Sequence, residues 1–529
     1  MRTLFHNARF WSGTEELVES ILVENDRIVD INSTELNSDT SVDLGGAFVM
    51  PAFIDGHAHP IFGGREAAGP KINGLNSVEE IIAEVARYAH ENKEEPWIIG
   101  GAYEAAIIEA GDFDAHWLDE AVDDRPVVLH AVDHHTIWVN TRALELAGLN
   151  ENTVDPVGGS LSRRENGQPK GTLREPSAMA LILELAPPAT IDSDIAAIKR
   201  ACDSYLSVGV TAATDAWVEK DMARAYMQAA RTGDLSISMN LAFLATPLTW
   251  KEHLEEFKQL RAECKNLSNP DLIMANTIKF LGDGALSAGT AALVEPYEDA
   301  PESSGIMIWK TSTLIEAIKA FDLQKFQVHI HAIGDAAVKQ AFEAIEVMIH
   351  ENPLWDRRPV IAHSQLICDE DLHRFKELGV IANIQPLWCY LDPMNKDLIL
   401  PRIGQIRNNL QYRLRTLIDH GATIAFGSDW PVTSNVPLLG LAVPIHRSNP
   451  LDPSTSSWEI SEALLMQEAL TFYTRNAAYQ MFRGDERGTL EVGKKADFLV
   501  LASNPFLTDP HDVSKIKINA VYQNGRVHL

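Results

Sequence analysis

The chain lacks the features that would place it in several broad classes of protein. Only 4 of its 529 residues are cysteines, and their spacings fit neither a zinc knuckle nor a disulfide framework. It has no run of about 18 apolar residues, so no membrane-spanning segment is predicted. The first residues, MRTLFHNARFW, lack the basic head and long apolar run of a signal peptide. We therefore expect a cytoplasmic protein.

Positive charge is scarce as well. The chain has 45 Lys and Arg residues against 74 Asp and Glu residues, a formal net charge of −29 at pH 7. Without a basic patch such a surface repels phosphate, which argues against a nucleic-acid partner. We expect a small-molecule substrate and no membrane partner, with a homodimer as the default assembly.

Eight short apolar runs are present, and each is typical of a buried strand. Hydrophobic residues make up 45% of the chain, enough for a large core. Helix-like patterns separate most of the runs. This alternation over eight units predicts an α/β protein built on a (β/α)8 TIM barrel. The runs cover residues 52–60, 210–217, 236–245, 276–284, 326–335, 359–366, 379–386 and 422–431.

Two further regions lie outside the barrel repeats. The first two runs are separated by about 150 residues, too many for an unstructured loop, so an inserted subdomain is predicted over about 62–200. Both ends of the chain show strand-and-turn texture. We expect residues 1–50 and 487–529 to form one composite β-sandwich, beside a barrel domain of residues 51–486.

The octapeptide FIDGHAHP, residues 53–60, contains two histidines with one residue between them. On a strand, where side chains alternate, His57 and His59 would share a face and could bind one metal ion. A pair of surface or hydrogen-bonded histidines fits the octapeptide equally well. The rest of the chain must therefore decide.

The ends of other predicted strands carry similar side chains. Barrel enzymes place their chemistry at the carboxyl ends of the strands. His331, His363 and Asp429 occupy such positions on separate runs. Nitrogen and carboxylate ligands suit Zn²⁺ or a similar divalent ion, which lowers the pKa of water and polarises a carbonyl. Asp429 is the predicted catalytic proton acceptor.

Taken together, the motifs resemble those of the amidohydrolase superfamily of metal-dependent barrel hydrolases. The similarity is greatest to the branch that contains N-substituted formamide deformylase. The motifs that carry the resemblance are GAFVMPAFIDGHAHP, DHHTIWVN, GTLREPSA, IKFLGDGALSAGTAAL, VHIHAIGD, IAHSQ, FGSDWPV, LTFYTRNAA and GTLEVGKKADFLVL.

The resemblance implies a divalent-metal cofactor, zinc first, with one or two ions. The implied metal ligands are His57, His59, Lys279, His331, His363 and Asp429. Lys279 would be carboxylated and would bridge two ions. The alternative is an ordinary salt bridge between Lys279 and Asp283, which leaves a single ion. Mn²⁺, Fe²⁺ and Ni²⁺ accept overlapping ligands, so the sequence does not fix the metal.

Five further residues are predicted to bind or orient the substrate. They are His135 in DHHTIWVN, Glu175 in GTLREPS, His329, Gln385 and Trp388. Three of them have a plain structural alternative: His135 as a structural histidine, Glu175 as a surface helix start and Trp388 as lid packing.

These residues predict a metal-dependent hydrolase that cleaves a non-peptide C–N bond in an N-substituted amide, formamide or acylated amine. A deaminase or a cyclic-amide hydrolase would use the same metal-activated water. A barrel that binds without turnover would be expected to lack a ligand or the terminal aspartate, and here all are present. The sequence does not name the substrate, because specificity lies in the loops and the insertion.

Overall fold

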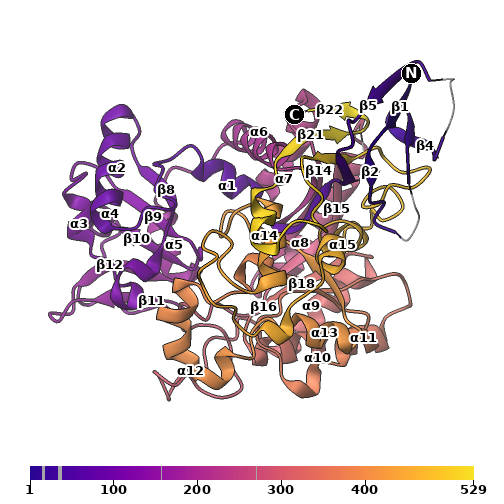
Figure 1. Ribbon diagram of the computed structural model, residues 1–529. Coiled ribbons are helices and arrows are strands. Elements are labelled where there is room, and N and C mark those ends of the chain that lie inside the picture. Colours follow the sequence, from indigo (N-terminus) through magenta and orange to yellow (C-terminus); the bar gives the residue numbers. More distant parts are fainter. Residues whose placement is uncertain (15–17, 34–37, 157, 270, 529) are drawn as a thin grey trace.

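The chain forms a barrel of eight parallel strands, shown in the computed structural model of Figure 1. The structure describes all residues except 15–17, 34–37, 157, 270 and 529. Each predicted apolar run overlaps one barrel strand, in the predicted order. The strands are β7 (Phe53–Ala58), β13 (Val210–Val218), β14 (Ser238–Ala245), β15 (Ile273–Leu281), β16 (Gln327–Ala332), β17 (Val360–His363), β18 (Ile381–Ile384) and β19 (Thr423–Phe426).

Helices pack against the outer face of the barrel through apolar stripes. In α10, Val338, Phe342 and Ile345 recur at helical spacing and are buried against the strands. The Thr190 side chain caps the start of α6 by accepting a hydrogen bond from the Ser193 N–H at 3.1 Å. The outer helices are α6 (Ile191–Ser207), α7 (Lys220–Thr232), α8 (Trp250–Lys265), α9 (Thr311–Leu323), α10 (Asp335–Glu351), α11 (Arg374–Glu377) and α13 (Leu414–Asp419).

Later helices complete the barrel and its rim. Ala477 and Ala478 of α16 pack with Ile54 and Ala212 of the first two barrel strands, near where these strands begin. None of the described helices combines the length and the apolar character needed to cross a membrane. The later helices are α12 (Leu400–Asn408), α14 (Pro437–His446), α15 (Met466–Tyr473) and α16 (Arg475–Gln480).

The predicted insertion forms a separate lobe on one side of the barrel (Figure 1). Its sheet has the strand order β11-β12-β10-β9-β8. The rings of Tyr103, Phe113 and Trp138 pack together in its core. Helix α1 (Pro60–Glu66) packs on α6 and leads into the lobe. The elements of the lobe are α2 (Val78–Glu91), β8 (Ile98–Tyr103), α3 (Ala115–Asp119), β9 (Val127–Ala131), β10 (Thr136–Val139), α4 (Thr141–Leu146), β11 (Ser160–Arg163), β12 (Pro169–Arg174) and α5 (Pro176–Leu183).

The two chain ends build a pair of sheets on the other side of the barrel (Figure 1). Phe5, Val49 and Phe498 share the core between these sheets. Their orders are β4-β3-β1-β5 and β2-β6-β20-β21-β22. The strands are β1 (Arg2–His6), β2 (Arg9–Phe10), β3 (Ile21–Glu24), β4 (Arg27–Ile31), β5 (Thr40–Asp43), β6 (Phe48–Pro51), β20 (Phe498–Leu501), β21 (Ile518–Gln523) and β22 (Arg526–Val527).

The predicted fold class is confirmed: the protein is a TIM barrel with additional sheets from the insertion and from both chain ends. The numerical domain boundaries, 1–50 with 487–529 and 51–486, stay a prediction.

Candidate metal centre

Two imidazole rings converge on one carboxylate oxygen at the carboxyl end of the barrel. The Nε2 atoms of His57 and His59 lie 3.2 and 3.1 Å from Oδ1 of Asp429. His57 and Asp429 are buried, and 13% of the His59 side chain is exposed. Two nitrogens and an oxygen meeting at one point form the kind of donor set that binds a divalent ion.

The backbone brings the two rings together by a route that strand alternation does not describe. β7 ends at Ala58, so His59 lies beyond the strand, with φ −130° and ψ 67°, just before Pro60 begins α1. The pairing of β7 with β13 also shifts register between Asp55 and Ala58. Such a bulge re-aims the side chains that follow it. His59 thus lies just past the end of the strand, and a bulge and a turn precede the point where its ring meets that of His57.

Two more predicted ligands stand beside this point. The ring of His363 lies 4.9 Å from that of His57 and 4.5 Å from that of His331, measured between centroids. Ligand atoms of His57, His363 and Asp429 all lie within 4.8 Å of one another. The Nε2 atom of His331 is 3.2 Å from the Gly284 carbonyl oxygen. Three of the six predicted ligands, His57, His363 and Asp429, thus form a compact triad. The rings of His59 and His331 lie next to this triad.

Lys279 lies with the histidines and not with its expected acidic neighbour. Its Nζ atom is 3.3 Å from Nε2 of His57, and the residue is only 1% exposed. Asp283 instead accepts three backbone N–H bonds at 2.8 to 3.0 Å from the loops after β15 and β16. Among the described ion pairs none joins Lys279 to Asp283. The structure therefore does not contain the alternative salt bridge.

Burial and neighbouring charges set the protonation of the cluster. Burial by itself would raise the pKa of Asp429, but its contacts with His57 and His59 hold that pKa well below the ordinary 3.8. Burial, and then the charge of Lys279, lower the pKa of His57 well below 6.5. Burial also lowers the pKa of Lys279 to about 8, against the opposing charges of Asp429 and Asp215. His57 is therefore neutral, with a lone pair available to a cation.

Three of the predicted substrate residues contact the ligand histidines. Nε2 of His329 lies 2.8 Å from Nδ1 of His57, and Oε1 of Gln385 lies 2.8 Å from Nδ1 of His363. Partners of this kind fix a ring so that its other nitrogen faces the metal. The Gln385 amide nitrogen donates to a side chain of β18, so both ends of the amide are used inside the barrel. Trp388 stacks on His363, with centroids 5.3 Å apart and planes 5° apart.

The insertion presents His135 to the metal centre. Its Nδ1 atom lies 3.0 Å from Oε2 of Glu175, and Oε1 of Glu175 accepts a hydrogen bond from Thr290 at 2.5 Å. The ring of His135 lies 5.7 Å from that of His331. Burial opposes protonation, but the charge of Glu175 raises the pKa of His135 to about 9. His135 therefore faces the centre as a cation at neutral pH.

The neighbouring residue, His134, was not among the predicted site residues. Its Nε2 atom lies 3.1 Å from Oε1 of Glu66, and its backbone has a φ of 54°. Against the effect of burial, the charge of Glu66 raises the pKa of His134, and the charge of Asp429 acts in the same direction. The adjacent histidines in DHHTIWVN were the available signal, although the ring of His134 stacks on that of His130 within the insertion, with centroids 5.4 Å apart.

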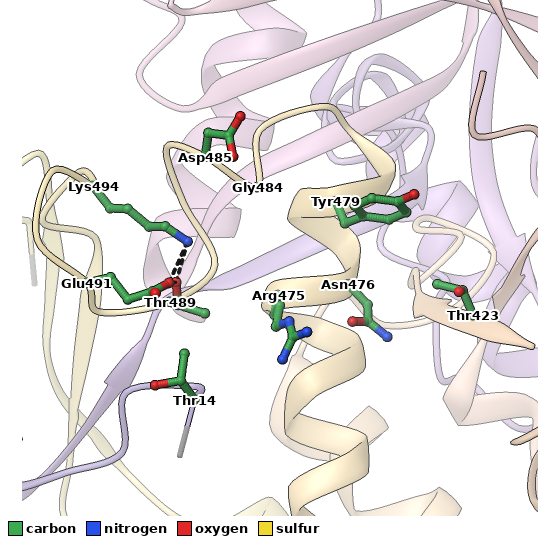
Figure 2. Close-up of a pocket in the computed structure, with 10 residues that line it drawn as sticks. All are labelled: Thr14, Thr423, Arg475, Asn476, Tyr479, Gly484, Asp485, Thr489, Glu491 and Lys494. Atoms are coloured by element: carbon green, nitrogen blue, oxygen red, sulfur yellow. Dashed lines mark hydrogen bonds and ion pairs between the residues drawn. The ribbon is translucent and has the colours of Figure 1, made fainter. Parts of the chain in front are cut away.

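A pocket of about 600 Å³ lies far from these residues, near where the barrel strands begin. In Figure 2, Arg475, Asn476 and Tyr479 extend from α16, and Lys494 contacts Thr489 on a neighbouring loop. The lining residues are Thr14, Thr423, Arg475, Asn476, Tyr479, Gly484, Asp485, Thr489, Glu491 and Lys494. Histidine and cysteine are absent from this described lining, so it offers no nitrogen or sulfur ligand set for a metal.

The residues at the carboxyl end fit a divalent metal ion. Although two imidazoles lie close to Oδ1 of Asp429, neither contact has hydrogen-bond geometry, and this buried oxygen has no hydrogen-bond partner among the described residues. A buried polar atom without a partner costs about 1–3 kcal/mol, which a bound cation would remove. Imidazole nitrogens with a carboxylate suit Zn²⁺ and its neighbours in the first transition row.

Comparison with known proteins shows the family of this chain. The sequence matches the amidohydrolase family over residues 40–528. The YtcJ protein of Bacillus subtilis (strain 168) is 30% identical over 100% of this chain and 99% of its own. N-substituted formamide deformylase of Arthrobacter pascens is 24% identical over 98% of this chain and 96% of its own. The crystal structure of an uncharacterized metal-dependent hydrolase from Pyrococcus horikoshii OT3 has a TM-score of 0.76 at 25% identity, covering 96% of this chain and 99% of that one.

The chain therefore belongs to the amidohydrolase family. It is a metal-dependent amidohydrolase, a hydrolase that acts on carbon–nitrogen bonds other than peptide bonds.

Proposed function

We propose that the protein hydrolyses the C–N bond of an N-substituted amide, formamide or other acylated amine. The observation that carries the proposal is the convergence of His57 and His59 on Asp429, at 3.2 and 3.1 Å, in a buried cluster. A divalent ion held there, zinc first, would lower the pKa of a water molecule and polarise the substrate carbonyl. A relative named N-substituted formamide deformylase supports this choice of substrate class.

His57, His59, His331, His363 and Asp429 would hold the ion or ions. His329 and Gln385 orient the rings of His57 and His363 through their Nδ1 atoms, so that each Nε2 faces the centre. The ligands thus enter from separate strands whose relative positions are set by the barrel.

Asp429 would move the proton. One carboxylate oxygen accepts a proton from the attacking water and returns it to the nitrogen of the leaving amine. The carboxylate is well placed for this because the Asp429 backbone N–H donates to the His57 carbonyl oxygen at 2.8 Å, which fixes it beside the ligand nitrogens.

His135 would bind the carbonyl oxygen of the substrate. Glu175 holds its Nδ1 side at 3.0 Å, and its ring faces that of His331 at 5.7 Å. A donor fixed in this way stabilises the negative charge that develops on the oxygen during attack. Trp388, stacked on His363, would form an apolar wall for the substrate.

Lys279 would carry the bridge between two ions. Its Nζ atom lies 3.3 Å from Nε2 of His57, among the residues that would hold the metal. A carboxylated lysine there would supply an anionic ligand, and metal analysis is expected to find two ions per chain. Metal restored to the apoprotein should give higher activity with bicarbonate than without it. A single ion with an unmodified lysine would contradict the bridge and leave the hydrolase proposal intact.

The test is a substrate panel with product identification. Apoprotein is loaded with Zn²⁺, Mn²⁺, Fe²⁺ or Ni²⁺ and offered N-formyl and N-acetyl derivatives of alkyl and aryl amines, with Asp429→Asn as the matched inactive control. Release of formate or acetate with an equal amount of amine, absent from the control, is the expected result.

Other products would identify the alternatives. Ammonia from an amino-substituted ring would indicate a deaminase, and ring opening of a lactam or hydantoin would indicate a cyclic-amide hydrolase. A metal-loaded protein that binds these compounds without turning any over would contradict the enzyme proposal.

A further inference from the structure

The first and last strands of the barrel meet at the metal centre without a strand ladder between them. Among the described strand pairs, β7 is joined to β13 and β19 to β18, and none joins β7 to β19. Two backbone hydrogen bonds instead join the end of β7 and the residue after it to the loop that follows β19. The His57 carbonyl accepts the Asp429 N–H at 2.8 Å, and the His59 N–H donates to the Trp430 carbonyl at 2.7 Å. We call the junction between β7 and β19 the seam of the barrel. It lies between His57 and Asp429, two of the residues that would hold the metal.

One buried carboxylate binds both sides of this seam. Oδ1 of Asp55 accepts the backbone N–H of Ser428 at 2.8 Å and that of His57 at 3.3 Å. Oδ2 accepts the Ser428 hydroxyl at 2.5 Å and the Tyr205 hydroxyl at 3.3 Å. The Ser428 oxygen in turn accepts the Trp430 N–H at 2.9 Å. We call Asp55 and Ser428, with the bonds that join Asp55 to Ser428 and to the His57 N–H, the seam strap.

The seam strap also explains the bulge in β7. Asp55 and His57 would share a face in a regular strand, but Asp55 reaches Tyr205 of the outer helix α6 while His57 faces His329 and His363 inside the barrel. A carboxylate that accepts the N–H two residues ahead stabilises such a turn of the backbone. Asp55 therefore holds the local conformation that turns His57 inward.

On the β19 side of the seam, the backbone of Gly427 packs directly against the backbone of His57, which leaves the two segments little room to shift. A Cβ atom built on Gly427 would lie 2.5 Å from the His57 backbone nitrogen. Only glycine lets the end of β19 come this near. The two ligand-bearing segments are thus in contact through backbone atoms, and Asp55 supplies the acceptors that hold them there.

We propose that Asp55 is a positioning residue whose carboxylate sets the separation of His57 and Asp429, and so the affinity and geometry of the metal site, without touching metal or substrate. The inference rests on the proposed function, because it takes His57 and Asp429 as ligands. A carboxylate suits this task because two acceptor oxygens can receive four hydrogen bonds from both segments at once.

Three variants separate this role from general stability. Asp55→Ala removes all four bonds of the carboxylate. Asp55→Asn keeps Oδ1 for the two backbone N–H groups and replaces only the oxygen that faces Ser428 and Tyr205. Tyr205→Phe is the matched control, because it removes one peripheral hydroxyl and keeps the ring that packs on Trp430.

The experiment is a Co²⁺ titration of each metal-free full-length protein. The visible spectrum of bound Co²⁺ reports ligand geometry, chelator competition gives affinity, and circular dichroism and thermal unfolding report the fold. We expect Tyr205→Phe to match the wild type. Asp55→Ala should bind Co²⁺ about 10- to 100-fold more weakly with an altered spectrum, the range seen when partners of metal ligands are lost. Asp55→Asn should lie between the two.

The outcomes separate this inference from the proposed function. A folded Asp55→Ala protein with wild-type affinity and spectrum would overturn the inference. If Asp55→Ala does not fold, the same two readouts are taken from Asp55→Asn, which keeps the side-chain shape and the acceptor for the His57 and Ser428 N–H groups. Wild-type affinity and spectrum in that variant would then overturn the inference. A wild type that takes up no Co²⁺ would overturn the proposed function, and this inference with it.

Discussion

The two ends of the barrel differ in what their polar side chains can do. At the carboxyl end, His57, Lys279 and Asp429 are buried together, with Nε2 of His57 3.2 Å from Oδ1 of Asp429 and 3.3 Å from Nζ of Lys279. At the amino end, a pocket of about 600 Å³ is lined by Arg475 and Asp485, which are exposed, and by Lys494, whose side chain is 16% exposed (Figure 2).

This difference indicates that buried groups able to bind a metal are a better guide to the candidate site than pocket volume. Charges exposed to water interact weakly and are screened by salt. Buried donors and acceptors interact strongly, and each one left without a partner is costly. The amino-end pocket measures about 600 Å³, but the carboxyl end has the convergent nitrogens and an oxygen with no hydrogen-bond partner among the described residues, which a cation would satisfy.

The largest effect should come from removing a converging imidazole. His57→Ala deletes the nitrogen 3.2 Å from Asp429 and leaves Lys279 without its nearest contact. We expect turnover to fall below detection and metal content, measured by mass spectrometry, to drop to less than half that of the wild type. His59→Ala should behave in the same way.

Arg475→Ala in the amino-end pocket is the matched control for this comparison. It removes a larger, charged side chain far from the centre, and we expect wild-type metal content and kcat. A His57→Ala protein with full metal content and turnover would contradict the assignment of the metal site to the carboxyl end of the barrel. An Arg475→Ala protein that lost both would contradict it as well.

The second effect concerns the proton. Asp429→Asn keeps an oxygen beside the ligand nitrogens but removes the base, so kcat should fall by about 10² or more, the usual range for a general base. Measurement of kcat at several neutral pH values, at saturating metal, tests this. Unchanged turnover would exclude Asp429 as the proton acceptor, even if the metal content were reduced.

The third effect should be smaller, because it acts through another residue. Glu175→Gln keeps a hydrogen-bond acceptor for His135 but removes the charge that keeps the ring cationic. We expect kcat to fall by about tenfold, at the lower end of the range for partners that orient a catalytic imidazole, with little change in KM. Glu491→Gln in the amino-end pocket makes the same chemical change and should leave kcat unaltered.

The barrel could be predicted from sequence because its signals are local. Each apolar run lies in one short segment, and alternation with helices fixes a parallel order. The ligand positions followed from the rule that barrel chemistry occupies the carboxyl ends of strands. His57, His363 and Asp429 were found in this way although they lie on three different segments.

The remainder of the site depends on contacts that have no local signal. Asp55 and Ser428 are 373 positions apart, and nothing near either residue shows that they meet. Lys279 has Asp283 as a nearby acidic neighbour, but the fold gives it His57 and gives Asp283 three backbone N–H groups. The bulge in β7 was missed for the same reason, because FIDGHAHP also satisfies the alternation of a regular strand.

The smallest predicted effect is on the pH dependence of stability. The test compares Asp392, beyond the carboxyl end of β18, with Asp485 in the amino-end pocket. Burial, and then the charge of Glu104, raise the pKa of Asp392 to about 7 from 3.8. The folded state therefore favours the protonated acid. The contribution of this carboxyl group to stability is fully present below pH 3.8 and is lost as the pH rises toward 7, where the folded state must hold a half-buried charge. Asp392→Asn keeps a neutral side chain that still accepts the Asn395 N–H. Relative to wild type, this variant should gain stability between pH 4 and 7 and keep that gain above pH 7.

Thermal unfolding midpoints at pH 5, 6, 7 and 8 measure this gain, which we expect to be about 1–2 °C for a chain of this size. Asp485→Asn makes the same change at an exposed position in the amino-end pocket, and its midpoints should follow the wild type at every pH. The decisive quantity is the difference between the variants, because each carries the same loss of formal charge. If the Asp392→Asn and Asp485→Asn variants gained stability equally as the pH rises, the gain would reflect the net charge of −29. The proposed contrast between a desolvated carboxyl end and a solvated amino end would then be wrong.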